Sequence, residues 1–163
     1  MTDSIAASHQ VVKVASSFAQ FTKHLEAALG HLDRAMFGKV ETEPAMVEAY
    51  LKQLGGEQDL VLFGMEDHGA LLTIAGAPRR AKQYAIGNPL IAMSMTQHDM
   101  RAALYAPLRV LVYEAADQKV RVEYDLPSSL FGQFGNAAIS KVADSLDAKL
   151  AALIASVDEQ GAK

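Results

Sequence analysis

"PLRVLVYEAADQKVRVEYD", Pro107 to Asp125, is the stretch of sequence that decides the fold. Apolar and polar residues alternate on both sides of a four-residue linker, 115–118, and such alternation is typical of half-buried β-strands. The linker has the length of a hairpin connection. Arg121, Glu123 and Asp125 share the polar face of the second strand, which predicts that this part of the sheet is partly exposed to water.

Helices are predicted on both sides of this hairpin. Toward the C-terminus, Asn136 is a candidate cap for a helix whose apolar stripe runs from Ile139 to Val157. Near the N-terminus, a β-branched run at 11–16 predicts a strand, and Ser17 with Gln20 forms a capping box at the start of a second amphipathic helix. About the first ten residues and residues 158–163 are expected to be flexible ends.

The middle of the chain predicts a further helix and two strands. A helix is expected from Pro44 to the Gly55-Gly56 pair. The continuously apolar segment 59–65, "DLVLFGM", predicts a strand buried on both faces in the middle of a sheet. After an irregular connection over 71–80, residues 82–86 predict another strand, which ends at the turn Gly87-Asn88-Pro89 and a new helix.

Composition limits the protein's class. The chain has 163 residues, of which 50% are hydrophobic, and contains no cysteine. It is therefore expected to form one domain, 1–163, without a disulfide framework, a thiolate zinc site or a cysteine nucleophile. A net charge of −4 argues against binding to nucleic acid, which requires clustered basic residues. The start, with acidic Asp3, lacks the order of a signal peptide, and no apolar run is long enough to span a membrane, so a soluble cytoplasmic protein is expected.

Glu66, Asp67 and His68 are the first candidates for chemistry. An imidazole beside a carboxylate suits a general base or a metal ligand. Residues 66 and 68 share one face of a regular strand, whereas residue 67 points to the other face. A metal at His68 would need at least one more ligand from elsewhere in the chain, and His98 with Asp99 is the best source by residue type. The alternative is that His68 ends the strand and makes only local hydrogen bonds.

The turn Gly87-Asn88-Pro89 is the second candidate. Free N–H groups at a helix start attract anions, and Arg79, Arg80 and Lys82 precede this turn in the sequence, so a small carboxylate or phosphate is a candidate ligand. Helix capping alone also explains Asn and Pro at these positions. The metal hypothesis needs His98 nearby, and if the helix after Pro89 continues, His98 shares a stripe with Ile91 and Met95 and turns inward; a buried, hydrogen-bonded histidine is the simpler alternative there.

Four ordered motifs, "MEDHGALL", "YAIGNPLIAMSM", "APLRVLVYE" and "VEYDLPSSL", together resemble the bacterial domain of unknown function 302 family. The resemblance covers residues 11–154. It implies an α+β fold, with a single mostly antiparallel β-sheet flanked by α-helices, that commonly forms a homodimer. It implies no established reaction. Relative to shorter family members, residues 31–58 look like an insertion that carries its own helix.

Three classes of function follow. The preferred class is a small-molecule-binding or accessory protein, with an apolar pocket completed by polar groups of His68, Asn88 and His98. The second is an enzyme that uses His68 with Glu66 or Asp67 for acid-base or metal-assisted chemistry. The third is a structural or interaction protein acting as a dimer through its amphipathic helices or its hairpin. The cofactor, if any, and the identity of the ligand do not follow from the sequence.

Overall fold

A six-stranded sheet forms the centre of the computed structural model, which describes residues 4–163. The strand order is β1-β6-β5-β4-β3-β2. All neighbouring pairs are antiparallel except β2 and β3, which are parallel. The strands are β1 (His9–Lys13), β2 (Gly30–His31), β3 (Val61–Asp67), β4 (Ala81–Gly87), β5 (Leu108–Glu114) and β6 (Val120–Asp125). The fold is therefore α+β with one mostly antiparallel sheet, as the family resemblance implies.

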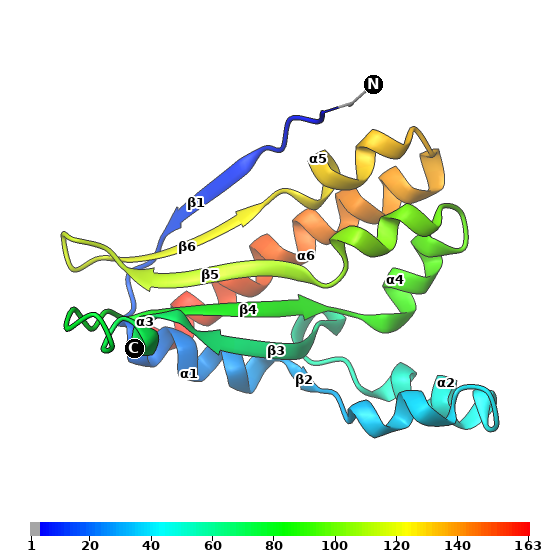
Figure 1. Cartoon of the computed structure of the whole chain (residues 1–163), viewed down its shortest axis with the longest axis horizontal. Helices are drawn as coiled ribbons and strands as arrows, with labels where there is room; N and C mark the ends of the chain where they lie inside the picture. Colours follow the sequence, from blue (N-terminus) through cyan, green and yellow to red (C-terminus); the bar gives the residue numbers. More distant parts are fainter. Residues whose placement is uncertain (1–3) are drawn as a thin grey trace.

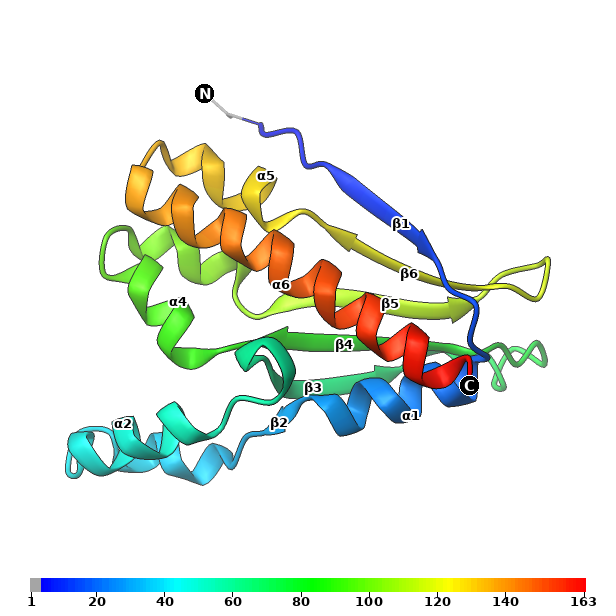
Figure 2. The same ribbon diagram turned by 180° about the vertical axis from the view of Figure 1, so that it is seen from behind.

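Helices cover one face of the sheet and its two ends. The α-helices are α1 (Phe18–Ala28), α2 (Pro44–Gln53), α3 (His68–Leu71), α4 (Pro89–Thr96), α5 (Pro127–Phe131) and α6 (Ala137–Gly161). Short 3-10 helices are η1 (Arg34–Lys39), η2 (Glu57–Asp59), η3 (Met100–Tyr105) and η4 (Gly132–Phe134). Figure 2 shows α6 lying diagonally across the sheet beside α1, whereas Figure 1 shows the opposite face with no helix in front of it. We call this opposite side the uncovered face.

The hairpin predicted from residues 107–125 is confirmed. Val112 of β5 lies opposite Val122 of β6, and both side chains are buried beneath the helices. Tyr113 and Arg121, the next pair in the register, point to the uncovered face and remain partly exposed. The alternation in sequence thus separates a dry face from a wet one.

Three predicted helix starts are also confirmed. The side chains of Ser17, Asn88 and Asn136 each accept hydrogen bonds from backbone N–H groups in the first turns of α1, α4 and α6. These bonds satisfy donors that have no partner within the helix. α2 begins at Pro44, where the missing N–H of proline has no structural cost.

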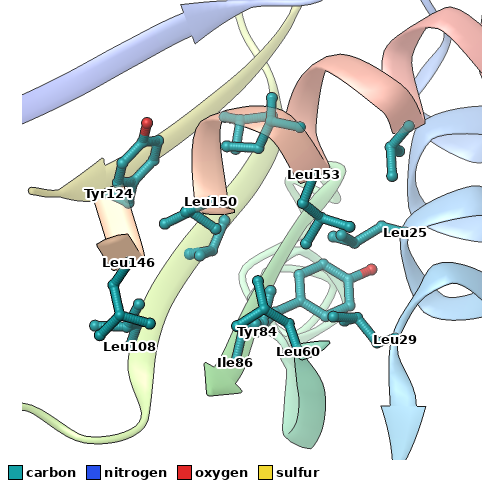
Figure 3. Packing of buried hydrophobic residues seen from close by; sticks show 14 of the residues in the cluster. Leu25, Leu29, Leu60, Tyr84, Ile86, Leu108, Tyr124, Leu146, Leu150 and Leu153 are labelled. Carbon is teal, nitrogen blue, oxygen red and sulfur yellow. The ribbon is translucent and has the colours of Figure 1, made fainter. Parts of the chain in front are cut away.

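The core lies between α6, α1 and the covered face of the sheet. Figure 3 shows Leu146, Leu150 and Leu153 of α6 directed toward the strands, where Tyr84 and Leu108 meet them. Their spacing of three and four residues places the three leucines on one side of the helix. The apolar stripe of α6 therefore packs in the same core as the buried face of the sheet.

One strand prediction is wrong in its placement. Strand β3 does not lie in the middle of the sheet, because its outer neighbour β2 pairs only with Val61 and Leu62. The side chains from Gly64 to Asp67 are exposed. The apolar run that suggested a central strand is explained by its first half, since Leu60 and Val61 are fully buried in the core and Phe63 lines a cavity.

The ends of the chain extend further into regular structure than the sequence predicts. Strand β1 begins at His9, inside the stretch expected to be a flexible end, and α6 continues to Gly161. Residues 1–3, including Asp3 and the start of that expected flexible end, lie outside the described residues. Within residues 4–163, every helix is too short or too polar to cross a bilayer.

Candidate functional site

The turn Gly87-Asn88-Pro89 joins β4 to α4 and is fixed by the side chain of Asn88. Its Oδ1 accepts hydrogen bonds from the N–H groups of Leu90 and Ile91, at 2.8 and 3.3 Å. Its Nδ2 donates to the carbonyl oxygen of Asp59 at 2.7 Å. Asn88 therefore starts α4 and also ties it to the segment that precedes β3.

An apolar cavity of about 190 Å³ lies against this turn. Its apolar walls come from segments far apart in the sequence: Phe37, Phe63, Ile91, Ala92, Met95, Pro107, Phe131 and Leu146. Asn88 is the only polar side chain that lines it among residues 4–163. An engineered apolar cavity of about 150 Å³ binds benzene, so this space suits a hydrophobic group of at least that size.

A second and more polar cavity, which we call the outer cavity, adjoins the apolar one. It has a volume of about 700 Å³ and lies between α2, α4 and α6. Asn88, Ile91 and Leu146 line both cavities. The charged side chains that line the outer cavity are Lys52, Asp59, Lys141 and Lys149. A molecule seated in the apolar cavity would therefore meet a mainly basic environment at its outer end.

The trio Glu66, Asp67 and His68 forms the end of β3 and the start of α3. The Oδ1 atom of Asp67 accepts a hydrogen bond from the N–H of Ala70 at 2.8 Å and so caps α3. All three side chains are exposed, and neither carboxylate is hydrogen-bonded to His68 among the described residues. The trio thus lies at the end of the strand, as the strand-end alternative of the sequence analysis has it, but the local hydrogen bond is made by Asp67 and not by His68.

His68 and Asn88 lie at opposite ends of the sheet. In the antiparallel register of β3 and β4, Asp67 lies opposite Lys82, whereas Val61 lies opposite Gly87. At about 3.3 Å per residue, the two ends are roughly 20 Å apart. The structure therefore does not bring His68 to the turn with Asn88.

The basic residues that precede the turn also lie at the far end of β4. Lys82 donates to the carboxylate of Glu26 at 2.9 Å, and Arg80 pairs with Glu114 at 3.3 Å. They cannot supply charge to a ligand near Asn88. The cations near the turn are instead the lysines of α2 and α6, which the sequence analysis did not connect with it because they come from distant segments.

The prediction that His98 turns inward is wrong. Helix α4 ends at Thr96, so the stripe through Ile91 and Met95 stops before His98, which is exposed. Asp99 caps η3 and pairs with Arg101 at 2.7 Å, and this guanidinium lowers the pKa of the Asp99 carboxyl. Within residues 4–163, no three side chains of the metal-ligating types gather into a cluster that could hold an ion.

A polar network on the uncovered face is absent from the sequence predictions. The Nδ1 atom of His9 lies 2.9 Å from Asp125 Oδ1, and its Nε2 atom lies 2.9 Å from Glu123 Oε2. Tyr113 donates its hydroxyl to Glu123 at 2.5 Å. The bonds to Asp125 and Glu123 raise the pKa of the His9 imidazole. The bonds from Tyr113 and His9 lower the pKa of Glu123.

This network joins three neighbouring strands, β1, β6 and β5, at one edge of the sheet. His9 is separated from its two carboxylate partners by more than one hundred residues, so no local pattern identifies it. Through these hydrogen bonds from His9 to Glu123 and Asp125, the network fastens the edge strand β1 to β6, and protonation of the imidazole strengthens them.

Comparison with known proteins agrees with this description of the fold. A solved structure described as "uncharacterized conserved protein DUF302 from Bacillus stearothermophilus" is similar to the chain, with a TM-score of 0.65 and 17% sequence identity. The match covers 90% of this chain and 95% of the other. At that identity, the likeness concerns the fold alone. No curated protein matches the sequence significantly.

A family model supplies the assignment that the structural likeness cannot. The model described as "Domain of unknown function DUF302" matches residues 38–157, which is well over half of the chain. The matched region includes α2, the turn with Asn88, the hairpin and most of α6, and so it contains nearly all of the walls of both cavities. The chain therefore belongs to the DUF302 family.

Proposed function

We propose that this protein binds a small molecule whose hydrophobic part occupies the apolar cavity beside the turn Gly87-Asn88-Pro89. The observation that carries the proposal is the cavity itself, about 190 Å³ of space with apolar walls and one amide, that of Asn88. Ligand sites are typically concave and mostly apolar, with a few placed polar groups. Well-packed interiors leave few voids of this size.

The arrangement of the walls supports binding rather than loose packing. Met95 and Phe131 at the base of the cavity are almost fully buried, while Phe37 at its outer side has 41% of its surface exposed. Phe37 belongs to η1, within the segment 31–58 that we propose to be a helical insertion in a single-domain chain. This segment thus contributes one wall of the cavity, the partly exposed aromatic side chain of Phe37.

The test uses 4-phenylbutan-1-ol as a neutral probe with an aromatic end and a polar end. Titration calorimetry is expected to show binding to the wild type, and thermal unfolding is expected to shift upward. At a probe concentration one hundred times the dissociation constant, the gain is about 2.7 kcal/mol. For a chain of this length that corresponds to roughly 5–10 °C.

Two variants in which leucine replaces an alanine make the test specific. Ala92 lines the apolar cavity, so Ala92→Leu is expected to fill part of it and abolish binding while the protein remains folded. Ala155 is an exposed residue of α6, so Ala155→Leu adds the same atoms without touching the cavity. If the probe does not bind the wild type, or if Ala92→Leu binds it as well as Ala155→Leu does, the proposal fails.

We also propose, from the family resemblance, that the protein forms a homodimer. The uncovered face supports this, because a groove of about 590 Å³ on it is bordered by Leu104, which has 80% of its surface exposed. Sedimentation equilibrium at micromolar concentration is expected to give the mass of two chains, and Leu104→Glu is expected to shift it toward one. A monomer in the wild type would contradict the proposal.

A further inference from the structure

At the boundary between the two cavities, apolar walls lie next to hydrogen-bond donors that have no partner. Ile91 and Leu146 contribute to the walls of both spaces, and Asn88 stands at the junction. Figure 3 shows Leu146 beside Leu108, and both side chains line the apolar cavity. A ligand that crosses the boundary must therefore be apolar at one end and meet polar groups at the other.

The amide of Asn88 leaves one of these donors available. Its Oδ1 is occupied by two N–H groups of α4, and one N–H of Nδ2 is bound to the carbonyl of Asp59. A primary amide has two N–H donors. The second N–H has no partner within residues 4–163, and an acceptor on a ligand would satisfy it.

Lys141 supplies the second available donor, and it is charged. Two of the three lysines around the outer cavity already have partners, since Lys149 binds Asp59 at 3.0 Å and Lys52 binds Glu48 at 2.6 Å. Lys141 has no ion-pair or hydrogen-bond partner in the described part of the chain. Because Glu48 and Asp59 pair with the other two lysines, Lys141 gives the outer cavity one unpaired positive charge, on a protein whose net charge is −4.

Because Lys141 and Leu146 both line the outer cavity, this charge is within reach of a short ligand. Leu146 marks the boundary on α6, and Lys141 precedes it by five residues. A rise of 1.5 Å per residue separates them by roughly 7.5 Å along the helix. A chain of a few methylene groups spans that distance, and the long lysine side chain shortens it further.

We infer that the ligand class is an amphiphilic carboxylate, with a hydrophobic group in the apolar cavity and its carboxylate held by Lys141 and the free N–H of Asn88. This inference rests on the proposed function, because it needs the apolar cavity to be occupied. A carboxylate only accepts hydrogen bonds, so it matches two donors with no acceptor between them. An amine offers only donors and meets like charge at Lys141.

The experiment compares three probes that share one hydrophobic part: 4-phenylbutyrate, 4-phenylbutan-1-ol and 4-phenylbutylamine. Calorimetry at low salt is expected to rank the acid first, the alcohol second and the amine last. The acid is expected to bind roughly fivefold more tightly than the alcohol, which is the effect of one partly exposed ion pair. Raising the salt concentration is expected to reduce this preference without changing the binding of the alcohol.

A pair of lysine variants locates the effect. Lys141→Gln is expected to lower the affinity for the acid to that for the alcohol and to leave the alcohol unaffected. Lys23→Gln removes the same charge from an exposed site on α1, remote from both cavities, and is expected to change neither affinity.

The outcomes distinguish the inference from the proposed function. Equal binding of the acid and the alcohol, or an equal response to both lysine variants, overturns the carboxylate assignment while the apolar site stands. Binding of none of the three probes overturns the proposed function and the inference together. Tighter binding of the amine also overturns the assignment, because it would require a negative outer cavity.

Discussion

Among single residues, Asp158 makes the densest set of hydrogen bonds between distant segments. Its carboxylate accepts from the N–H of Ala15 at 2.9 Å, and from the N–H and hydroxyl of Ser16 at 2.8 and 2.7 Å. Burial opposes ionisation of this group, but the bonds from Ala15 and Ser16 outweigh it and lower the pKa of Asp158. The last turns of α6 are thereby fixed to the segment that starts α1.

Replacing this carboxylate is expected to lower the free energy of unfolding. In Asp158→Asn, the side-chain NH2 group replaces one of the oxygens that accept hydrogen bonds from Ala15 and Ser16, so a donor faces a donor. We expect the free energy of unfolding at pH 7, measured in urea, to fall by about 1–3 kcal/mol. Because the folded pKa is lowered, the carboxylate stabilises the protein above its unfolded pKa, and this contribution disappears as the pH falls through the folded pKa.

The difference between the two proteins should therefore shrink below about pH 4. Glu159→Gln, at the exposed neighbouring position, is the control and is expected to change the stability by less than about 0.5 kcal/mol. A loss of the same size in both variants would contradict a specific role for Asp158.

His9 provides the second test at this scale. Its pKa is raised by the hydrogen bonds to Asp125 and Glu123, so the folded state binds the proton more tightly than the unfolded state does. The stabilisation is complete below the unfolded pKa of about 6.5 and is lost as the pH rises through the folded pKa. NMR titration of the His9 ring is expected to show a midpoint above the usual value.

The same titration identifies the cause. Asp125→Asn removes the larger of the two contributions, and we expect it to move the His9 midpoint back toward its usual value. Asp144→Asn removes an equal charge from an exposed position of α6 and should leave the midpoint unchanged. A midpoint that is the same in all three proteins would show that the network does not form in solution.

Among the helices, α4 and α6 have nearly identical caps but different roles. Asn136 accepts from the second and third N–H groups after it at 2.9 and 3.2 Å, much as Asn88 does at 2.8 and 3.3 Å. Only Asn88 also reaches another segment, through Asp59. Comparing variants of the two asparagines therefore separates the effect of helix capping on stability from the effect of Asn88 on ligand binding.

We expect Asn136→Ala to lower the free energy of unfolding by about 1 kcal/mol, the usual value of such a cap. Asn88→Ala is expected to cost about 1 kcal/mol more, because it also removes the hydrogen bond to Asp59. Only Asn88→Ala is expected to weaken the binding of 4-phenylbutyrate as well. Urea unfolding and calorimetry measure the two effects. If the two variants bind 4-phenylbutyrate with equal affinity, Asn88 does not contribute to the binding site.

The elements that could be predicted from sequence are those with local causes. Ser17, Asn88 and Asn136 act within their own first helical turn, and the alternation in 107–125 is visible within one hairpin. The position of β3 depends instead on how far β2 extends beside it, which is a contact between segments thirty residues apart. The error at His98 has a local origin, since nothing in the helical stripe marks its end at Thr96.

The candidate site was only partly predictable for the same reason. The turn with Asn88 stands out in the sequence because asparagine followed by proline marks a helix start. Its surroundings do not, because Phe37, Phe131 and Leu146 reach the cavity from three separate parts of the chain. The basic residues near the turn in sequence are far from it in space, and those near it in space belong to α2 and α6.

For the molecule as a whole, α6 makes the core a single unit. Its apolar stripe contacts α1 and α5 as well as the sheet, and Leu153 in that stripe is completely buried. Leu153→Ala is expected to cost about 2–5 kcal/mol. Far-UV circular dichroism and tyrosine fluorescence should report the same urea midpoint, because helices and sheet share this core.

Leu71→Ala, at a position with 62% of its surface exposed, is the control and should change the stability by less than about 0.5 kcal/mol. Separate midpoints for the two signals in the wild type would show instead that the helices and the sheet unfold independently.

The short length of β2 has a consequence for how copies of this protein behave when crowded. From Phe63 to Asp67, the outer edge of β3 has no neighbouring strand within residues 4–163. A bare edge is a template on which other chains can stack into fibres. Here the register shift between Leu62 and Gly64 distorts the edge, and the charges of Glu66 and Asp67 repel an identical strand. The carboxylates of Glu66 and Asp67, which the sequence offers as candidates for chemistry, therefore oppose edge-to-edge pairing between copies of the protein.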